Sequence, residues 1–346
     1  MSLLRRTASV IAAAAIALTG LAAQPAHAAD ADVYTTPGGH IVNDRLWDTQ
    51  CSMYSSNVVR CTTNVWGTQI RYEKGRFVNK TGWQFNNITY LASPRAAWKG
   101  NPLGDLSATD KGNFTSAGRN WRTACDTAVT GRGGCRSHVE SDYIAYEGGR
   151  YVQKRGFVFN NMVRFAEGSV PAVTAVPLHV LDQSELTVDG LGPLSFAPEK
   201  ATTYVKVFPN LERLGYVRKG NVDECTAWVE GPELVKRGIS VTGLADVAVD
   251  QPGIKTDKGA EVGMTIGQVK AIYGSAFQQV LKQNHAEKQY FGSVKVGNRE
   301  LQFRVLGEPY SDGAHRYAPL TPLKDSDIVH VIAAQTYLTD VSFGGC

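Results

Sequence analysis

The acid and base candidates in this sequence are one histidine and two carboxylates spaced two residues apart. They are His138, Glu140 and Asp142. Side chains at every second position of a β-strand point to the same face, so a strand here would place all three together. Two carboxylates beside an imidazole could exchange protons with a substrate, which is general acid and base chemistry. A secreted hydrolase is therefore one interpretation, while a solvated strand face explains the same spacing.

Other catalytic and metal-binding patterns are missing from the sequence. It contains no G-x-S-x-G nucleophile motif and no G-x-x-x-x-G-K-[ST] phosphate loop. Zinc sites need closely spaced ligands such as C-x-x-C, and the six cysteines form no such pair. We therefore predict no metal and no cofactor, and we name no catalytic residue beyond the three candidates above.

The acid and base candidates lie in a segment that the chain contains twice. Residues 45–87 and 119–161 share 17 identical positions over 43 residues at a constant offset of 74. This is the signature of a tandem duplication. The first copy has Asn64, Trp66 and Thr68 at the positions equivalent to the three candidates. The candidate cluster is therefore specific to the second copy.

Each copy also contains two cysteines at the same spacing. An even number of cysteines in an exported chain indicates disulfides, and the duplication selects one pairing among the possible ones. A local bridge would compensate for the thin core of so small a unit. We predict β-rich module 1 at residues 38–92 and its duplicate, module 2, at residues 112–166. The predicted disulfides are Cys51–Cys61, Cys125–Cys135 and Cys225–Cys346.

Alternating apolar and polar residues, interrupted by turn residues, predict a succession of strands in each module. Regular alternation puts Trp83, Phe85 and Asn87 on one face and Asn86 on the other. The segment between the modules contains Trp98, and its length predicts that it packs on its neighbours rather than serving as a free linker.

The aromatic and amide residues of the modules have two interpretations. They form the core of each module, since aromatic residues dominate burial in small domains. Alternatively, they form two identical shallow sites for a repeating ligand such as a cell-wall glycan, because two linked weak sites gain from effective concentration. The candidate ligand-binding residues are Tyr72, Arg76, Trp83, Asn86, Tyr146, Arg150, Phe157 and Asn160.

The rear half of the chain has a different pattern. Residues 167–182 read as an extended linker because they are rich in proline and small residues. Residues 183–346 contain fewer aromatics and longer aliphatic runs, which predict an α+β domain with a helix on an antiparallel sheet. The predicted elements are strands at 241–249 and 327–334, a helix capped by Thr265 that ends before Gly274, and a hairpin of 288–296 and 300–305.

A motif in this rear region carries a resemblance. Residues 256–274 read T-x-x-G-x-x-V-G-M-T-x-x-x-V-K-x-x-Y-G. This segment resembles the helix-opening motif of the beta-lactamase-inhibitor-protein-like and outer-membrane-assembly-lipoprotein-like α+β domains. Together with Cys225, Trp228 and the terminal Gly345-Cys346, it is similar to a C-terminal domain of secreted actinobacterial proteins of unassigned function. The tandem modules resemble parts of similar secreted proteins. The resemblance implies binding of other proteins.

The first residues predict export. Arg5 and Arg6 precede an apolar run at residues 10–23, and Ala26-His27-Ala28 supplies a cleavage site, so residues 1–28 read as a signal peptide. Its removal lowers the formal charge from +4 to +2. A nearly neutral protein has no electrostatic attraction to nucleic acid. No later stretch is long and apolar enough for membrane insertion of the mature chain.

The sequence therefore predicts an α+β protein of two tandem disulfide modules and a rear α+β domain, secreted after cleavage near Ala28. We expect a non-enzymatic binding protein that recognises an extracellular protein or a cell-envelope component. The alternatives are the secreted hydrolase near His138 and a bivalent cell-wall glycan-binding protein. The oligomeric state and the identity of the ligand are left open.

Overall fold

The computed structural model describes residues 32–131, 133–166, 173–195, 204–219, 228–242, 246–284, 287–307 and 319–336. The predicted signal peptide and the predicted Cys225–Cys346 pair lie outside these residues. No helix within the described ranges is long and apolar enough to cross a membrane.

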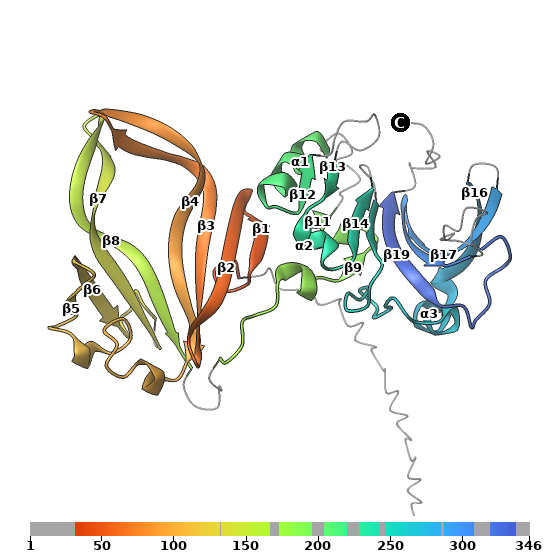
Figure 1. The fold of residues 1–346 in the computed structure, drawn as a ribbon, viewed down its shortest axis with the longest axis horizontal. Helices are drawn as coiled ribbons and strands as arrows, with labels where there is room; N and C mark the ends of the chain where they lie inside the picture. The colour runs from red at the N-terminus through yellow and green to blue at the C-terminus, as the bar shows by residue number, and fades with distance from the viewer. Residues whose placement is uncertain are drawn as a thin grey trace, which may run out of the picture. The chain divides into compact units, whose positions relative to one another are not determined.

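The two copies of the duplicated segment form one eight-stranded sheet of order β1-β2-β3-β4-β8-β7-β6-β5 (Figure 1). Each copy supplies four strands in chain order that pair antiparallel, and the copies join where β4 and β8 pair in parallel. The sequence predicted the two copies but not this shared sheet. The strands are β1 (Gly38–Val42), β2 (Arg45–Ser55), β3 (Val58–Glu73), β4 (Arg76–Ser93), β5 (Asn113–Ser116), β6 (Arg119–Cys125), β7 (Gly134–Glu147) and β8 (Arg150–Phe165).

Tight turns close the long hairpin of each copy. Lys74 and Gly75, between β3 and β4, have φ values of +51° and +79°, and Gly148 and Gly149, between β7 and β8, have +57° and +80°. Positive φ at both central residues defines a two-residue turn whose twist matches that of the flanking strands. The strands therefore stay paired up to the turn, with Glu73 opposite Arg76 in the first hairpin.

A β-bulge interrupts each long hairpin at the same place in the repeat. Thr63 pairs with Asn87 while the next residue, Asn64, pairs with Phe85, so Asn86 is an extra residue on β4. Asn160 is the extra residue at the equivalent point of β8. An extra residue bends its strand and increases the local twist. The F-N-N sequence that ends each copy therefore encodes a bulge.

This bulge corrects the predicted arrangement of faces. Regular alternation put Phe85 and Asn87 on the same face. Their partners Asn64 and Thr63 are consecutive on β3 and point to opposite faces. Phe85 is accordingly 50% exposed and Asn87 only 1% exposed. The prediction was wrong because the period of two breaks wherever one residue is inserted.

Both described disulfides link residues that lie opposite each other on adjacent antiparallel strands. Cys51–Cys61 joins β2 to β3, and Cys125–Cys135 joins β6 to β7. The Cα atoms are 4.0 Å apart in each pair. These are the two local bridges that the duplication predicts.

The segment between the copies is packed, as its length predicts. It contains two short 3-10 turns, η1 (Arg95–Trp98) and η2 (Leu106–Ala108). Trp98 is 1% exposed, and its Nε1 donates a hydrogen bond to Ser93 Oγ at 2.9 Å. Its ring lies in a core cluster with residues of both copies, including Tyr90 and Cys135. This tryptophan therefore helps to join the copies at the β4–β8 seam.

The rear region contains a six-stranded antiparallel sheet of order β14-β15-β19-β18-β17-β16 and two smaller sheets. The strands are β9 (Leu186–Thr187), β10 (Gly190–Leu191), β11 (Leu194–Ser195), β12 (Val217–Lys219), β13 (Trp228–Glu230), β14 (Ile239–Thr242), β15 (Asp246–Val249), β16 (Phe277–Asn284), β17 (Glu287–Val296), β18 (Arg299–Val305) and β19 (Val329–Thr336). The helical elements are η3 (Val180–Gln183), α1 (Tyr204–Arg213), α2 (Pro232–Val235), α3 (Ile266–Tyr273) and η5 (Gly274–Ala276).

The predicted rear helix is confirmed as α3. Thr265 caps it by accepting a hydrogen bond from the Gln268 backbone, and the Gln268 side chain accepts from the Thr265 backbone in return. Gly274 follows its last residue. The helix buries its apolar side, including Ile266, in the core cluster that contains Phe303 of the six-stranded sheet.

Of the strands predicted for the rear region, the hairpin and the last strand are present and one is not, and β9 to β13 and β16 were not predicted. The predicted hairpin is present as β17 and β18, and the last predicted strand is present as β19. Residues 241–249 do not form one strand: β14 ends at Thr242, β15 begins at Asp246, and the two pair antiparallel. All of β15 is buried, so the aliphatic pattern does not separate it from β14.

The described part of the chain is mostly β-sheet, with a few short helices. The α+β prediction is therefore supported only in part, since strands provide nearly all of the regular structure.

Candidate functional site

The two long hairpins end beside each other (Figure 1). The ring centroids of Phe77 and Tyr151, one from each hairpin, lie 5.8 Å apart. Each ring also contacts its cross-strand neighbour: Tyr72 lies 5.0 Å from Phe77, and Tyr146 lies 5.1 Å from Tyr151. We call these four residues the tip surface. It is a continuous row of four rings, with the central contact made between the two copies.

The tip surface is open to solvent. Tyr146 is 66% exposed, Tyr72 47%, Tyr151 41% and Phe77 37%. Aromatic side chains usually contribute to folding by being buried. A contiguous group of exposed aromatic rings is a candidate contact surface.

The tip surface combines equivalent positions of the duplication. Tyr72 corresponds to Tyr146 and Phe77 to Tyr151, each at the offset of 74. The sequence predicted two separate shallow sites that contained Tyr72 and Tyr146. In the structure these residues belong to one row, because the hairpins meet at their tips.

Charged residues surround the tip surface in the same pattern in both copies. Glu73 Oε2 lies 3.4 Å from Lys80 Nζ, and Glu147 forms the equivalent ion pair with Lys154. The hydrogen bond from Lys154 to Glu147 raises the pKa of that ammonium group. Each glutamate faces an exposed arginine across the turn; these predicted site residues are Arg76 and Arg150.

The other four predicted ligand-binding residues lie away from the hairpin turns. Trp83 packs edge to face with Trp66 at a centroid distance of 5.5 Å. The Arg122 guanidinium lies 4.4 Å from the centroid of the Phe157 ring. The remaining two, Asn86 and Asn160, are the extra residues of the bulges. The predicted set therefore divides between the tips and the middle of the hairpins.

The asparagine that follows each bulge residue is buried. Asn87 and Asn161 are 1% and 2% exposed, and the Oδ1 atom of each has no hydrogen-bond partner in the described structure. Asn87 Nδ2 donates to Thr89 Oγ1 at 3.1 Å, and Asn161 Nδ2 donates to Asn160 Oδ1 at 3.2 Å. These amides belong to the interior of the bulge and offer no surface contact.

The acid and base candidates do share one face of β7, as their spacing predicts. His138, Glu140 and Asp142 lie opposite Phe159, Phe157 and Arg155 on β8. Burial, together with the charges of Arg136 and Arg122, lowers the pKa of His138, so its ring is neutral at pH 7. Positive charges close to an imidazole disfavour its protonation.

The carboxylates of this face are held by other side chains. Glu140 Oε2 accepts a hydrogen bond from Asn120 at 2.9 Å, and its Oε1 lies 3.4 Å from Arg155 Nε. Asp142 Oδ1 lies 3.9 Å from Arg155 Nη1. The hydrogen bonds from Asn120 and Arg155 lower the pKa of Glu140, which favours a permanent carboxylate over a proton donor.

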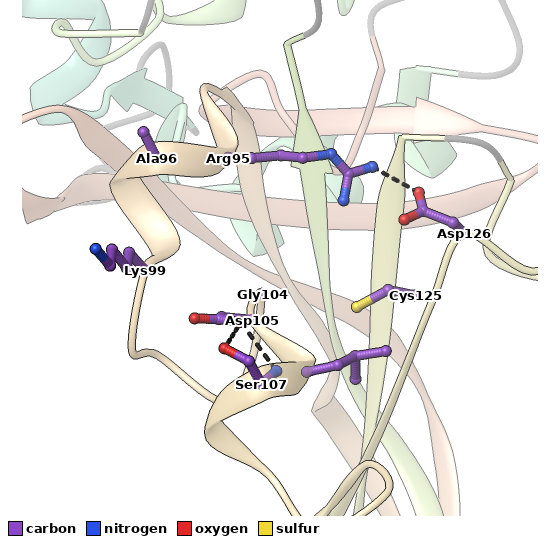
Figure 2. Close-up of a pocket in the computed structure, with 9 residues that line it drawn as sticks. Arg95, Ala96, Lys99, Gly104, Asp105, Ser107, Cys125 and Asp126 are labelled. Atoms are coloured by element: carbon purple, nitrogen blue, oxygen red, sulfur yellow. Dashed lines mark hydrogen bonds and ion pairs between the residues drawn. The ribbon is translucent and has the colours of Figure 1, made fainter.

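A pocket of about 450 Å³ lies between η1, η2 and the end of β6 (Figure 2). The ion pair of Arg95 and Asp126, 2.7 Å apart, is part of its wall. Asp105 accepts hydrogen bonds from the Ser107 backbone and hydroxyl, at 2.9 and 2.6 Å, and thereby caps η2. Four polar residues of the wall, Arg95 with Asp126 and Asp105 with Ser107, are thus bonded in pairs, and Lys99 and Cys125 of the second disulfide also line the pocket.

Among the residues that the structure describes, no group of three or more His, Cys, Asp or Glu side chains is placed to hold a metal ion.

Two residues of the tip surface were not among the predicted site residues. Phe77 and Tyr151 each follow the arginine of the turn. Pairing across a two-residue turn places them opposite the predicted tyrosines. The hairpin register was therefore the signal that could have identified them, whereas the contact between the copies has no local signal.

Comparisons with protein-family models, curated proteins and solved structures found nothing that matches this chain.

Proposed function

We propose that this chain is a secreted, non-enzymatic binding protein that recognises a cell-envelope component or an extracellular protein through the tip surface. The single observation that carries this proposal is the contact between Phe77 and Tyr151, at 5.8 Å, which joins two exposed aromatic pairs into one row. Large rigid rings and arginines are the side chains that contribute most to binding surfaces. Both kinds are present at the tips.

A non-enzymatic role is supported by the state of the acid and base candidates. Glu140 is hydrogen-bonded by Asn120 and Arg155, and the pKa of His138 is lowered. The pocket of Figure 2 is lined by residues other than these. A hydrolase would need a cleft that gathers such groups around a substrate.

We further propose that residues 183–346 are an inhibitor-protein-like domain that binds other proteins. The support is the resemblance of residues 256–274, together with the capping box that begins α3 and the antiparallel sheet whose core it shares. Secretion is supported by the two disulfides, since such bonds persist in oxidising compartments. Cleavage near Ala28 belongs to the same proposal.

The test is binding of the purified mature protein to the wall fraction, the membrane fraction and the secreted proteins of the producing organism, prepared separately. We expect Tyr72→Ala combined with Tyr146→Ala to weaken binding to one fraction by about tenfold or more, because two exposed rings are removed from the row. Thermal unfolding of the variant checks that the fold is kept.

The matched control is Phe85→Ala. Phe85 lies on the first hairpin and is 50% exposed, close to the 47% of Tyr72, but it is not part of the tip surface. The control should bind almost as tightly as the native protein. Equal losses in the control and the tip variant, or no binding to any of the three fractions, would overturn the proposed function.

A further inference from the structure

The two hairpin tips carry an unusual concentration of positive charge. Residues 70–80 and 144–154 together contain six basic and two acidic residues, a net charge of +4. The whole chain of 346 residues has the same formal charge of +4. Most of this charge comes from the first tip, because residues 70–80 have a net charge of +3 and residues 144–154 a net charge of +1. An anionic partner complements a positively charged surface.

The acidic residues of the tips are already neutralised. Glu73 and Glu147 form ion pairs with Lys80 and Lys154 on the neighbouring strands. The turn residues Lys74, Arg76 and Arg150 are exposed beside the rings. An approaching anion therefore meets the cationic turn residues first, with the aromatic rings next to them.

The arrangement of the rings indicates the kind of anionic partner. Adjacent rings of the tip surface are tilted by 51° to 60° relative to each other. They therefore do not form the flat platform on which successive sugar rings would stack. Tyrosine and phenylalanine flanked by lysine and arginine is the composition that proteins place at the boundary between lipid headgroups and acyl chains.

The backbone of the tips also suits that boundary. The strands pair up to Glu73 with Arg76 and Glu147 with Arg150, so each turn leaves only two central residues outside the ladder. Unpaired backbone groups are costly in an apolar medium, and a two-residue turn leaves few of them. A longer and more open loop would be less suited to this contact.

We infer that the tip surface docks on an anionic lipid surface, with the four rings at the headgroup boundary and the turn cations on the lipid phosphates. This inference rests on the proposed function and names the partner of that same surface. The contact is peripheral and shallow, because only the two turns and the adjacent rings take part. Both tips must engage together, since their rings are in contact.

The experiment is cosedimentation of the mature protein with vesicles of phosphatidylglycerol and phosphatidylcholine, and with vesicles of phosphatidylcholine alone. We expect binding to the anionic vesicles at low salt and a loss of about tenfold or more at high salt, because salt screens exposed charges. Neutral vesicles should bind at least about tenfold more weakly. Equal binding to both vesicle types would overturn the inference.

Two double variants separate the contributions of rings and charges. Tyr72→Ala with Tyr146→Ala should weaken binding to anionic vesicles by about tenfold at both salt concentrations. Arg76→Gln with Arg150→Gln should weaken it at low salt and reduce its salt dependence. Phe85→Ala should bind as the native protein does. Unchanged binding of both double variants would place the contact elsewhere on the protein and overturn the inference.

One further arm distinguishes this inference from the proposed function. The same variants are tested on purified, lipid-free wall polysaccharide and on the protein components of the envelope. Tip-dependent binding there, without binding to anionic vesicles, overturns the lipid partner and leaves the proposed function in place. If the tip variants bind every fraction as the native protein does, the lipid inference and the proposed function are both overturned.

Discussion

The two copies of the duplicated segment share the features that shape the sheet. They differ in the chain segments that pack beside their disulfides. Each has a cross-strand disulfide, a bulge at the first asparagine of its F-N-N motif and a two-residue turn at the hairpin tip. These features set strand register, twist and length. Their covering segments come from different parts of the chain.

In the first copy the cover is the segment just before the sheet. The Val33 carbonyl accepts hydrogen bonds from the hydroxyls of Thr49 and Thr63, and the Thr35 carbonyl lies 3.9 and 3.8 Å from the sulfurs of Cys51 and Cys61. Backbone carbonyls from outside the repeat thus contact both the disulfide and the pair of hydroxyls beside it.

The hydroxyl pair itself is common to both copies: Thr49 Oγ1 and Thr63 Oγ1 lie 2.9 Å apart, and the equivalent Thr123 Oγ1 and Ser137 Oγ lie 2.7 Å apart. Trp98 packs in the same cluster as Cys135, while Cys125 lines the pocket between the 3-10 turns. A duplicated sheet can therefore keep its internal geometry while each copy obtains its cover from a different neighbouring segment.

The largest expected effect comes from removing the disulfides one at a time. Cys51→Ala with Cys61→Ala, and Cys125→Ala with Cys135→Ala, should each lower the free energy of unfolding by about 3 kcal/mol, because a closed loop of this length restricts the unfolded chain to that extent. Both bridges span a sequence separation of 10. Urea unfolding followed by tryptophan fluorescence measures both values.

Equal losses would mean that the closed loops alone determine the contribution of each bridge. A difference of more than about 1 kcal/mol, beyond the usual error of such comparisons, would show that the two covers contribute unequally. Reduction of the native protein by a thiol under native conditions provides the control, and it should open Cys125–Cys135 first because Cys125 borders the pocket.

A smaller effect is expected from the histidine that only the first copy contains. His40 is 4% exposed, its Nε2 lies 2.7 Å from the Thr36 carbonyl, and the second copy has Phe114 in its place. Burial lowers the pKa of His40 below 6.5 although the Thr36 carbonyl opposes the shift. The unfolded chain therefore binds more protons below that pH, and the stability that neutral His40 allows is lost as pH falls through 6.5 toward the lower folded pKa.

Exchange of these residues between the copies tests this directly. His40→Phe should reduce the loss of stability on acidification, measured by urea unfolding at neutral and mildly acidic pH. Phe114→His, also beside a tryptophan of the sheet, should introduce an additional loss. An unchanged pH dependence in His40→Phe would mean that other groups are responsible.

The smallest expected effect is at the hairpin turns. Lys74 has a φ of +51°, which costs a residue with a side chain, and the second copy has Gly148 at the equivalent position. Lys74→Gly should stabilise the protein by up to about 1 kcal/mol, and Gly148→Lys should destabilise it by about the same amount. The thermal midpoints of the two variants measure this. Shifts of the same sign in both would show that the two turns are not equivalent.

Local patterns predicted a large part of the fold. The cysteine spacing gave both described bridges, the capping signal at Thr265 gave α3, and the turn residues gave the β17–β18 hairpin. The errors arose where the alternation of apolar and polar residues did not signal the structural feature. The bulge at Asn86 placed Phe85 and Asn87 on opposite faces, and the aliphatic run at 241–249 did not show that two antiparallel strands lie there.

The candidate site was likewise predicted only in part. The sequence alone identified Tyr72, Arg76 and their copies at the turns, because the duplication makes them visible. It did not identify the partnership of Phe77 with Tyr151.

The sequence by itself determined the duplication, the local bridges and the strand-rich character of the two modules, since each depends on residues close together in the sequence. Only the tertiary structure decided that β4 and β8 pair in parallel and that the two hairpin tips meet. The physical reason is that a parallel pair and a contact between tips each depend on the combined twist of strands far apart in the sequence. The spacing of residues within either copy does not encode this combined twist.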